Sequence, residues 1–326
     1  MPLIDVNNIF SVKPAGFDQL ALDIFRYQYL HCAVYRDWCN HMQIDAHAVD
    51  SVASIPFLPI SFFKTHQVIA ENKSEAIVFE SSGTGKAATS KHYVADVSVY
   101  TKSFTQQFER MFGSPKDWCI LSLLPAYLER KGSSLVMMAE VLMQQSGHPD
   151  NGFYLYDFPA LAEKLQRLNA AGQKVLLLGV SFALMDFSEA FPMHLPHTTV
   201  METGGMKGRK EEITRQALHH YLCKQLGLKQ VATEYGMTEL LSQAYAEGEG
   251  LLSPAPWMRA LVRDESDPLL VQSAGRGILN IIDLANIYSC AFIATEDAGV
   301  VYPDGRFEVL GRVDNSDIRG CSLLAV

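Results

Sequence analysis

Short apolar runs alternate with amphipathic segments between residues 118 and 239, and this alternation most constrains the fold. Residues 174–180 read KVLLLGV, a continuous apolar run of the kind that parallel sheets bury on both faces. Comparable runs predict three further strands, at 118–126, 198–205 and the first half of 230–239. Helical spacing predicts helices between the strands, at 133–147, 159–172 and 211–227. Strands that alternate with helices indicate an α/β fold with a mostly parallel sheet flanked by helices.

Two regions flank this core. Residues 17–42 carry apolar side chains at helical spacing and predict one helix. The segment 55–69 contains two prolines that exclude a continuing helix, so an extended element is predicted. Short strands and turns follow residue 250, with P-D-G at 303–305 as a hairpin signal. We therefore expect an α/β core over 1–250 and a small β-rich subdomain over 251–326 packed on it.

Charge and cysteine content exclude several classes of protein. The formal net charge of −9 argues against a general nucleic-acid binder, because phosphate contacts need clustered Lys and Arg. The six cysteines show neither paired spacing nor a C-x-x-C, so no disulfide framework is predicted. The N-terminal residues lack the basic region and long apolar run expected of a signal peptide, and no apolar stretch reaches the ~18–20 residues needed to span a bilayer. We expect a cytoplasmic protein with reduced thiols and no transmembrane segment.

A loop of glycines and hydroxyl residues, SSGTGK at 81–86, follows a short apolar strand predicted at 76–80. The loop could bind a phosphate group in three ways. Gly83 and Gly85 let backbone N–H groups approach closely, and Lys86 adds one positive charge. Hydroxyl donors come from Ser81, Ser82 and Thr84. A P-loop is excluded, because position 80 is Glu and position 87 is Ala. A dinucleotide fingerprint fits loosely, but weak helix formers follow it. A Ser/Thr/Gly-rich phosphate loop and a plain polar turn stay open.

The run E-Y-G-M-T-E at 234–239 is the most specific motif, and it resembles the Y-G-x-T-E motif of the adenylate-forming superfamily. The resemblance implies that Tyr235 stacks on adenine, that Thr238 binds the α-phosphate and that Glu239 holds Mg²⁺. Elementary chemistry agrees, because a Tyr ring offers a flat face to a purine and a carboxylate suits Mg²⁺ bound together with phosphates. Gly236 is expected to permit the turn.

Two more motifs follow the order of the same superfamily. Gly204 and Gly205 end the strand predicted at 198–205, where the superfamily has a glycine pair, and the resemblance implies that their backbone lines the adenine pocket. The run ATEDAGVVYPDGRFEVLGRVDNSDIRG at 294–320 resembles the superfamily's T-G-D and G-R-x-D motifs. Asp297 is then expected to bind the ribose hydroxyls and Arg312 to contact the ribose, roles that suit a carboxylate and a guanidinium. Glu296 departs from the pattern, which has Gly there.

Within the superfamily the chain most resembles the acyl-protein synthetases. They share its P-x-x-P-x-x-x-F-K stretch, here Pro56, Pro59, Phe63 and Lys64. They also resemble it in lacking the lid domain, whose catalytic Lys could be replaced by Lys64, Lys86 or a partner subunit. In that family a cysteine near the C-terminus receives the acyl group, which implies this role for Cys321, where Arg319 favours the thiolate. A small apolar residue closing a strand is the alternative reading of Cys321.

The resemblance implies ATP-dependent activation of a carboxylic acid, a fatty acid above all, as an acyl-adenylate, with Mg²⁺ as the metal. The acyl group is then transferred to a thiol, either Cys321 or one on an acyl carrier protein, coenzyme A or a partner reductase or transferase subunit. The residues expected to be catalytic are Thr238, Glu239, Lys86 and Cys321. An ATP-independent acyltransferase and a non-catalytic module that binds acyl groups or nucleotides stay open as alternatives.

Overall fold

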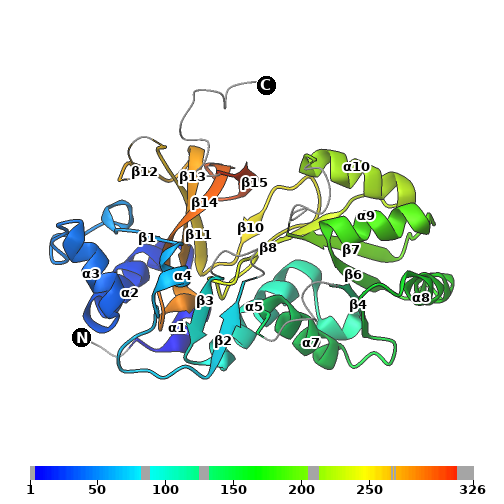
Figure 1. Cartoon of the computed structure of the whole chain (residues 1–326), viewed down its shortest axis with the longest axis horizontal. Coiled ribbons are helices and arrows are strands. Elements are labelled where there is room, and N and C mark those ends of the chain that lie inside the picture. The colour runs from blue at the N-terminus through cyan, green and yellow to red at the C-terminus, as the bar shows by residue number, and fades with distance from the viewer. Residues whose placement is uncertain are drawn as a thin grey trace.

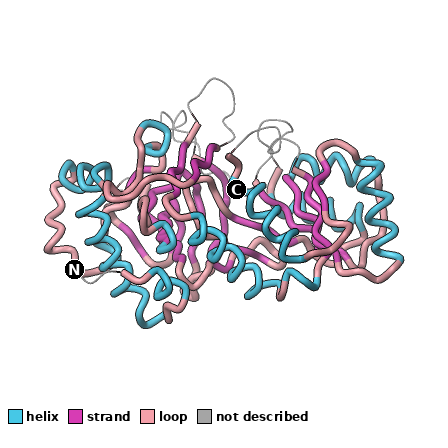
Figure 2. Tube along the Cα trace, turned by 90° about the horizontal axis from the view of Figure 1, so that it is seen from below, coloured by secondary structure: helices cyan, strands magenta, loops and turns pink. Residues whose placement is uncertain are grey.

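The strands within the described residues form two large sheets and one separate hairpin. The computed structural model describes residues 4–81, 89–124, 132–204, 213–265, 267 and 269–313. Helices cover both sheets (Figure 1). Seen from below, the strands gather in two groups along the long axis of the molecule (Figure 2). The described part of the chain is therefore organised around two sheets that lie next to each other.

The larger sheet is the core that the alternating pattern predicts. Its strand order is β10-β9-β8-β7-β6-β4-β5, and every pair from β5 to β8 is parallel. The pairs β8–β9 and β9–β10 are antiparallel, so this sheet is mixed. The strands are β4 (Cys119–Leu123), β5 (Gly152–Tyr154), β6 (Val175–Val180), β7 (Thr198–Thr203), β8 (Ala232–Tyr235), β9 (Ala244–Ala246) and β10 (Ser253–Pro254).

Helices cover this sheet on both faces. Figure 1 shows α9 and α10 on one side of it and α5 and α7 on the other. Every residue of β6 is buried, as expected for a strand covered on both faces. The predicted helices of the core are confirmed. The sequence did not predict α9, because its apolar residues directly continue the apolar run of β6. The helices are α5 (Val97–Phe112), α7 (Ser134–Ser146), α8 (Phe158–Ala170), α9 (Ser181–Ala190) and α10 (Arg215–Leu226).

The second sheet is mainly antiparallel and contains the C-terminal strands. Its order is β1-β14-β13-β11-β12, and β15 also pairs with β14. The turn at 302–305 joins β14 to β15, which confirms the hairpin predicted from P-D-G. The strands are β1 (Leu58–Pro59), β11 (Met258–Arg263), β12 (Val271–Gln272), β13 (Gly275–Asp283), β14 (Phe292–Val301) and β15 (Phe307–Arg312), with the 3₁₀ turn η4 (Leu284–Asn286) between β13 and β14.

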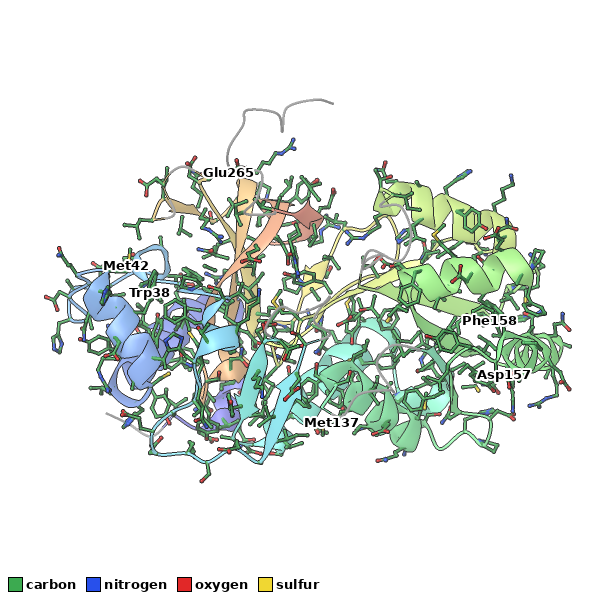
Figure 3. All side chains as sticks on the ribbon, in the orientation of Figure 1. Trp38, Met42, Met137, Asp157, Phe158 and Glu265 are labelled. Carbon is green, nitrogen blue, oxygen red and sulfur yellow. The ribbon has the colours of Figure 1, made fainter. Side chains whose placement is uncertain are left out.

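The N-terminal helices pack against this second sheet. The buried side chain of Gln28 donates to the carbonyls of Asn286 and Ile287, and β1 lies parallel to β14. Trp38 lies in this N-terminal part, at the opposite end of the molecule from Asp157 at the start of α8 (Figure 3). The helices are α1 (Val6–Phe10), α2 (Phe17–His31), α3 (Ala33–His41) and α4 (Phe62–Thr65).

Two predictions for the N-terminal part need correction. The helix expected over 17–42 is two helices, because Cys32 adopts an extended conformation with φ −109° and ψ 102°. The segment 55–69 is extended only around β1, and α4 forms one helical turn after it. The division of the chain at residue 250 stays a prediction, although β1 already belongs to the sheet of the C-terminal strands.

The glycine-rich loop is flanked by two antiparallel strands. β2 (Ile77–Glu80) pairs with β3 (Lys91–Val94), and α5 begins only after β3. P-loops and dinucleotide loops both lead from a strand directly into a helix. The hairpin therefore excludes both of those readings of the segment 81–86 and retains the two that the sequence left open.

Candidate active site

Tyr235 and Asp297 meet at the junction of the two sheets. The hydroxyl of Tyr235, at the end of β8, donates to Asp297 Oδ2 on β14 over 2.9 Å. Arg312 lies opposite Asp297 on β15, with its Nε 3.5 Å from Asp297 Oδ1. Phe307 packs against the Tyr235 ring edge to face, at 5.3 Å between ring centres. The three residues expected to bind adenine and ribose are thus gathered in one place.

Glu239 brings a buried carboxylate to the same junction. Glu239 is only 5% exposed, and burial raises the pKa of its carboxyl group. A hydrogen bond with the Ser90 side chain and the positive charges of Arg312 and Lys64 act in the opposite direction. The charges of two distant segments, β15 and α4, therefore act on Glu239. Because burial outweighs these contacts, a cation bound at Glu239 would stabilise its ionised carboxylate further.

The backbone after Tyr235 is fixed by side chains from β3 and from the β13–β14 connection. His92 Nδ1 lies 2.9 Å from the Thr238 carbonyl, and Asn286 Nδ2 donates to the Glu239 carbonyl over 2.7 Å. Asp283 accepts from the backbone N–H groups of residues 241 and 242. Sequence reasoning missed these supporting residues, because each lies in an ordinary strand or turn pattern and carries no motif of its own.

Two more carboxylates are buried under this loop. Burial raises the pKa of Glu234 to about 7, although Thr203 Oγ1 donates to it, and neighbouring Glu202 raises it further. Glu202 is paired with Arg215 on α10, at 3.2 Å. A Cβ at Gly236 would lie 2.5 Å from Glu234 Oε1. A side chain at position 236 would therefore require this carboxyl to shift, a constraint that is separate from the predicted role of Gly236 in permitting the turn.

Several predicted residues lie outside the described part of the chain. Of the phosphate loop, Ser81 is described, and its Oγ accepts from the Ser90 N–H over 2.9 Å. Gly204 is described at the end of β7, where its carbonyl accepts from Ser181 Oγ over 2.7 Å. The expectations for Ser82, Gly83, Thr84, Gly85, Lys86, Gly205 and Cys321 fall outside the described residues.

The architecture is that of an adenylate-forming enzyme. A 2-hydroxyisobutyryl-CoA ligase, solved in the postadenylation state with an acyl-AMP, has a similar fold, with a TM-score of 0.63 and 11% identity over 96% of this chain and 72% of the ligase. The O-succinylbenzoate coenzyme A synthetase of Bacillus subtilis, solved with AMP, matches with a TM-score of 0.50 and 15% identity over 76% of this chain and 64% of the synthetase. At these identities the likeness shows the fold alone.

Within that class the chain belongs to the acyl-protein synthetase (LuxE) family, whose model matches residues 12–325. A long-chain-fatty-acid–luciferin-component ligase of Aliivibrio fischeri is 22% identical over 97% of this chain and 91% of the relative. A ligase of the same name from Photorhabdus luminescens is 37% identical over 86 residues, which are 23% of this chain and 73% of the relative. The chain is accordingly an enzyme of the acid ligase class.

The helices that the structure describes include none with the length and apolar character that crossing a membrane requires.

Proposed function

We propose that the chain uses ATP to activate a fatty acid as an acyl-adenylate and then passes the acyl group to a thiol. The observation that carries this proposal is the convergence of Tyr235, Glu239, Asp297 and Arg312. These residues come from β8, the loop after it, β14 and β15, yet they surround one junction between the sheets. The named activity of the Aliivibrio fischeri relative, a long-chain fatty acid ligase, supports a fatty acid as substrate.

In the first step, a carboxylate oxygen of the acid attacks the α-phosphorus of ATP. A new P–O bond forms, the bond between the α-phosphorus and the bridging oxygen breaks, and pyrophosphate leaves with the electron pair. Tyr235 offers its ring to adenine and Asp297 offers its remaining lone pairs to the ribose hydroxyls. Arg312, which is largely exposed, is free to turn toward ribose or phosphate oxygens.

The residues present fit Mg²⁺. Mg²⁺ is usually held by one or two carboxylates together with substrate phosphates and water. Glu239 supplies such a carboxylate, and the described residues contain no group of three or more metal-binding side chains that would point to a separate protein cage. Bound Mg²⁺ would supply positive charge to the phosphate oxygens as pyrophosphate leaves. Ser90 and Arg312 would partly offset the cost of burying the ionised Glu239 carboxylate, and the bound metal would offset more of it.

Lys64 is our candidate for the cation that a lid lysine provides in adenylate-forming enzymes with a lid domain. It lies on α4, directly after Phe63, whose ring contacts that of His92 edge to face at 5.6 Å between centres. The positive charge of Lys64 acts to lower the pKa of Glu239. Since a Lys ammonium is a compact point charge on a flexible stem, it can follow a phosphate group during the step.

In the second step, a thiolate sulfur attacks the carbonyl carbon of the adenylate, a thioester forms and AMP leaves with the electron pair. Burial raises the pKa of each of the five cysteines that the structure describes, and thiolates are correspondingly scarce there. For Cys39 and Cys119 the pKa reaches about 12. This supports Cys321 or a thiol on a partner protein as the acceptor.

ATP–pyrophosphate exchange with a series of carboxylic acids tests the first step. We expect exchange with fatty acids, a fall of about 100-fold or more for Glu239→Gln, and no change for the matched exposed variant Glu247→Gln, because Mg²⁺ charge stabilisation is worth several kcal/mol. Lys64→Ala should lower exchange without changing ATP binding, and Lys64→Arg should restore part of it. Acyl transfer that proceeds without ATP would identify the chain as an acyltransferase and end the proposal.

Retention of labelled acyl groups after denaturation tests the acceptor. We expect wild-type protein to hold the label through a hydroxylamine-sensitive thioester and Cys321→Ser to lose it while pyrophosphate exchange continues. A Cys321→Ser variant that keeps the label would move the acceptor role to another thiol.

A further inference from the structure

Two consecutive backbone carbonyls of the loop, those of Thr238 and Glu239, accept hydrogen bonds from buried side chains. His92 Nδ1 contacts the Thr238 oxygen at 2.9 Å, and Asn286 Nδ2 contacts the Glu239 oxygen at 2.7 Å. A carbonyl oxygen only accepts hydrogen bonds, so His92 carries its hydrogen on Nδ1 and Asn286 presents its amide NH₂ group. Both tautomer and amide orientation follow from these two contacts.

This assignment leaves one acceptor on each side chain. They are His92 Nε2 and Asn286 Oδ1, and both are buried without a hydrogen-bond partner among the residues that the structure describes. Both residues are 0% exposed. Burial lowers the pKa of His92 to about 4, while its hydrogen bond to the Thr238 carbonyl acts in the opposite direction. His92 is therefore neutral near pH 7, and Nε2 presents a lone pair.

The two side chains line the same small cavity. It lies between β3 and η4, and Tyr93, Tyr288 and Ser289 also border it. The space open to the centre of a water molecule is about 10 Å³, close to what one ordered water needs. Two unpartnered acceptors on residues that border one cavity can both be satisfied by a molecule with two donor hydrogens. Water is the smallest molecule that meets this requirement, and buried waters commonly satisfy such groups.

We propose that one buried water bridges His92 Nε2 and Asn286 Oδ1, and that the two side chains and this water form a clamp that positions Thr238 and Glu239. The inference rests on the proposed function, because it assigns the clamp to the adenylate-forming site. β3 leads away from the glycine-rich loop and η4 leads into β14, which carries Asp297. The clamp thus joins three segments of the site. His92 and Asn286 are positioning residues, since they act through the backbone of the loop.

Kinetics of pyrophosphate exchange at varied Mg²⁺ concentration test the clamp. We expect His92→Leu and Asn286→Leu to lower the maximal rate 10- to 100-fold and to raise the Mg²⁺ concentration for half-maximal exchange about 10-fold, because supporting residues of metal sites have effects of about this size. The double variant should be little worse than the more affected single variant, since both changes release the same loop. His92→Gln retains a donor and should recover most of the rate.

A matched control separates the clamp from a general effect of burial. Thr198 is also buried with an unpartnered side-chain oxygen among the described residues, but it begins β7, at the opposite end of the strand from Gly204. Thr198→Val should leave the Mg²⁺ dependence unchanged. Leucine variants that keep the wild-type rate within twofold and the wild-type Mg²⁺ dependence would overturn the clamp.

A crystal structure of the wild-type protein gives a readout that does not depend on activity. We expect density for one water within hydrogen-bond distance of His92 Nε2 and Asn286 Oδ1, and its loss in His92→Leu crystals. A dry cavity in well-ordered wild-type crystals would overturn the bridging water. If wild-type protein shows no exchange with any acid, the proposed function fails, and the density alone still decides the clamp. If a leucine variant does not fold, the wild-type crystal and His92→Gln carry the test.

Discussion

The hydrogen bond between Tyr235 and Asp297 joins residues 62 positions apart and fixes one corner of the site. Each partner is at most 9% exposed, so the Tyr235 hydroxyl depends on Asp297 for its hydrogen bond. Burial and the charge of Asp297 hold the pKa of Tyr235 well above its usual value, so the phenol stays a donor. At the residue scale, these two residues of the proposed site are thus held in place by each other.

Asp297→Ala should raise the KM for ATP about 10- to 100-fold. Hydrogen bonds from ribose hydroxyls to a carboxylate are worth about 1.5–3 kcal/mol, and this variant removes them. Tyr235→Phe keeps the ring and removes one neutral donor, so a change of only a few-fold is expected. Pyrophosphate exchange at varied ATP concentration measures both. An unchanged KM in Asp297→Ala would assign the ribose contact to another residue.

Glu234 should make stability fall as the pH rises toward neutrality. Its carboxyl ionises near 4.5 when unfolded and near 7 when folded, chiefly because of burial. The folded state therefore binds the proton more tightly, and this stabilisation is complete below pH 4.5 and is lost as the pH rises through about 7. At about 1.4 kcal/mol per pKa unit, the loss is on the order of 3 kcal/mol.

Glu234→Gln isolates this contribution, because an amide cannot ionise but retains an acceptor for Thr203. Asp283, whose pKa burial raises to about 6, is common to both proteins and cancels in the comparison. Denaturant unfolding between pH 5 and 8 should give a free-energy difference between wild type and variant that changes in favour of the variant as the pH rises. A constant difference over this range would show that Glu234 does not titrate there.

At the scale of elements, α7 and α10 both end at a glycine, but the surroundings of the two glycines differ. Gly147 ends α7 with φ 66° and Gly227 ends α10 with φ 60°, the left-handed conformation that glycine adopts without strain. A Cβ at Gly147 would meet nothing within 4 Å, whereas a Cβ at Gly227 would overlap the His194 side chain and lie 3.1 Å from its Cα.

Gly147→Ala should therefore destabilise the fold by about 1 kcal/mol, the strain of the left-handed conformation. Gly227→Ala should cost about 2–4 kcal/mol, because overlap with His194 adds to the same strain. Urea denaturation of both variants measures the difference. Equal losses would indicate that His194 moves aside freely and that backbone strain accounts for the whole effect.

At the scale of the whole molecule, the proposed site draws on both sheets and on the N-terminal segment. β8 belongs to the mixed sheet, β14 and β15 to the antiparallel sheet, and α4 follows β1 at the edge of the latter. Arg215 on α10 adds a further link, because it pairs with Glu202 and also donates to the Val309 carbonyl on β15. A ligand held at this junction therefore contacts both halves of the fold at once.

ATP with Mg²⁺ should stabilise the whole chain against unfolding. A ligand at 100 times its Kd contributes about 2.7 kcal/mol when it binds only the folded state. Thermal unfolding of the wild type should shift upward by several degrees with ATP and Mg²⁺, and by less with ATP alone. In Glu239→Gln the increment due to Mg²⁺ should vanish. The same increment in wild type and variant would place the metal away from Glu239.

The sequence by itself determined most elements of the α/β core and the order of the motifs. The apolar run of β6, the helices that end at Gly147 and Gly227, and the hairpin at 303–305 follow from spacings of a few residues, which local backbone geometry dictates. Tyr235 and Asp297 could be proposed as site residues because they stand in recognisable motifs. Such patterns can be recognised without knowledge of the fold.

Only the tertiary structure decided how these parts meet. The break at Cys32, the pairing of β1 with β14 and the contact of Gln28 with a carbonyl 258 residues away leave no local trace in the sequence. The roles of His92 and Asn286 were also decided only by the tertiary structure, since each looks like an ordinary buried residue until its partner carbonyl is known. The physical reason is that such contacts depend on how whole elements pack, and packing distributes its energy over many distant residues.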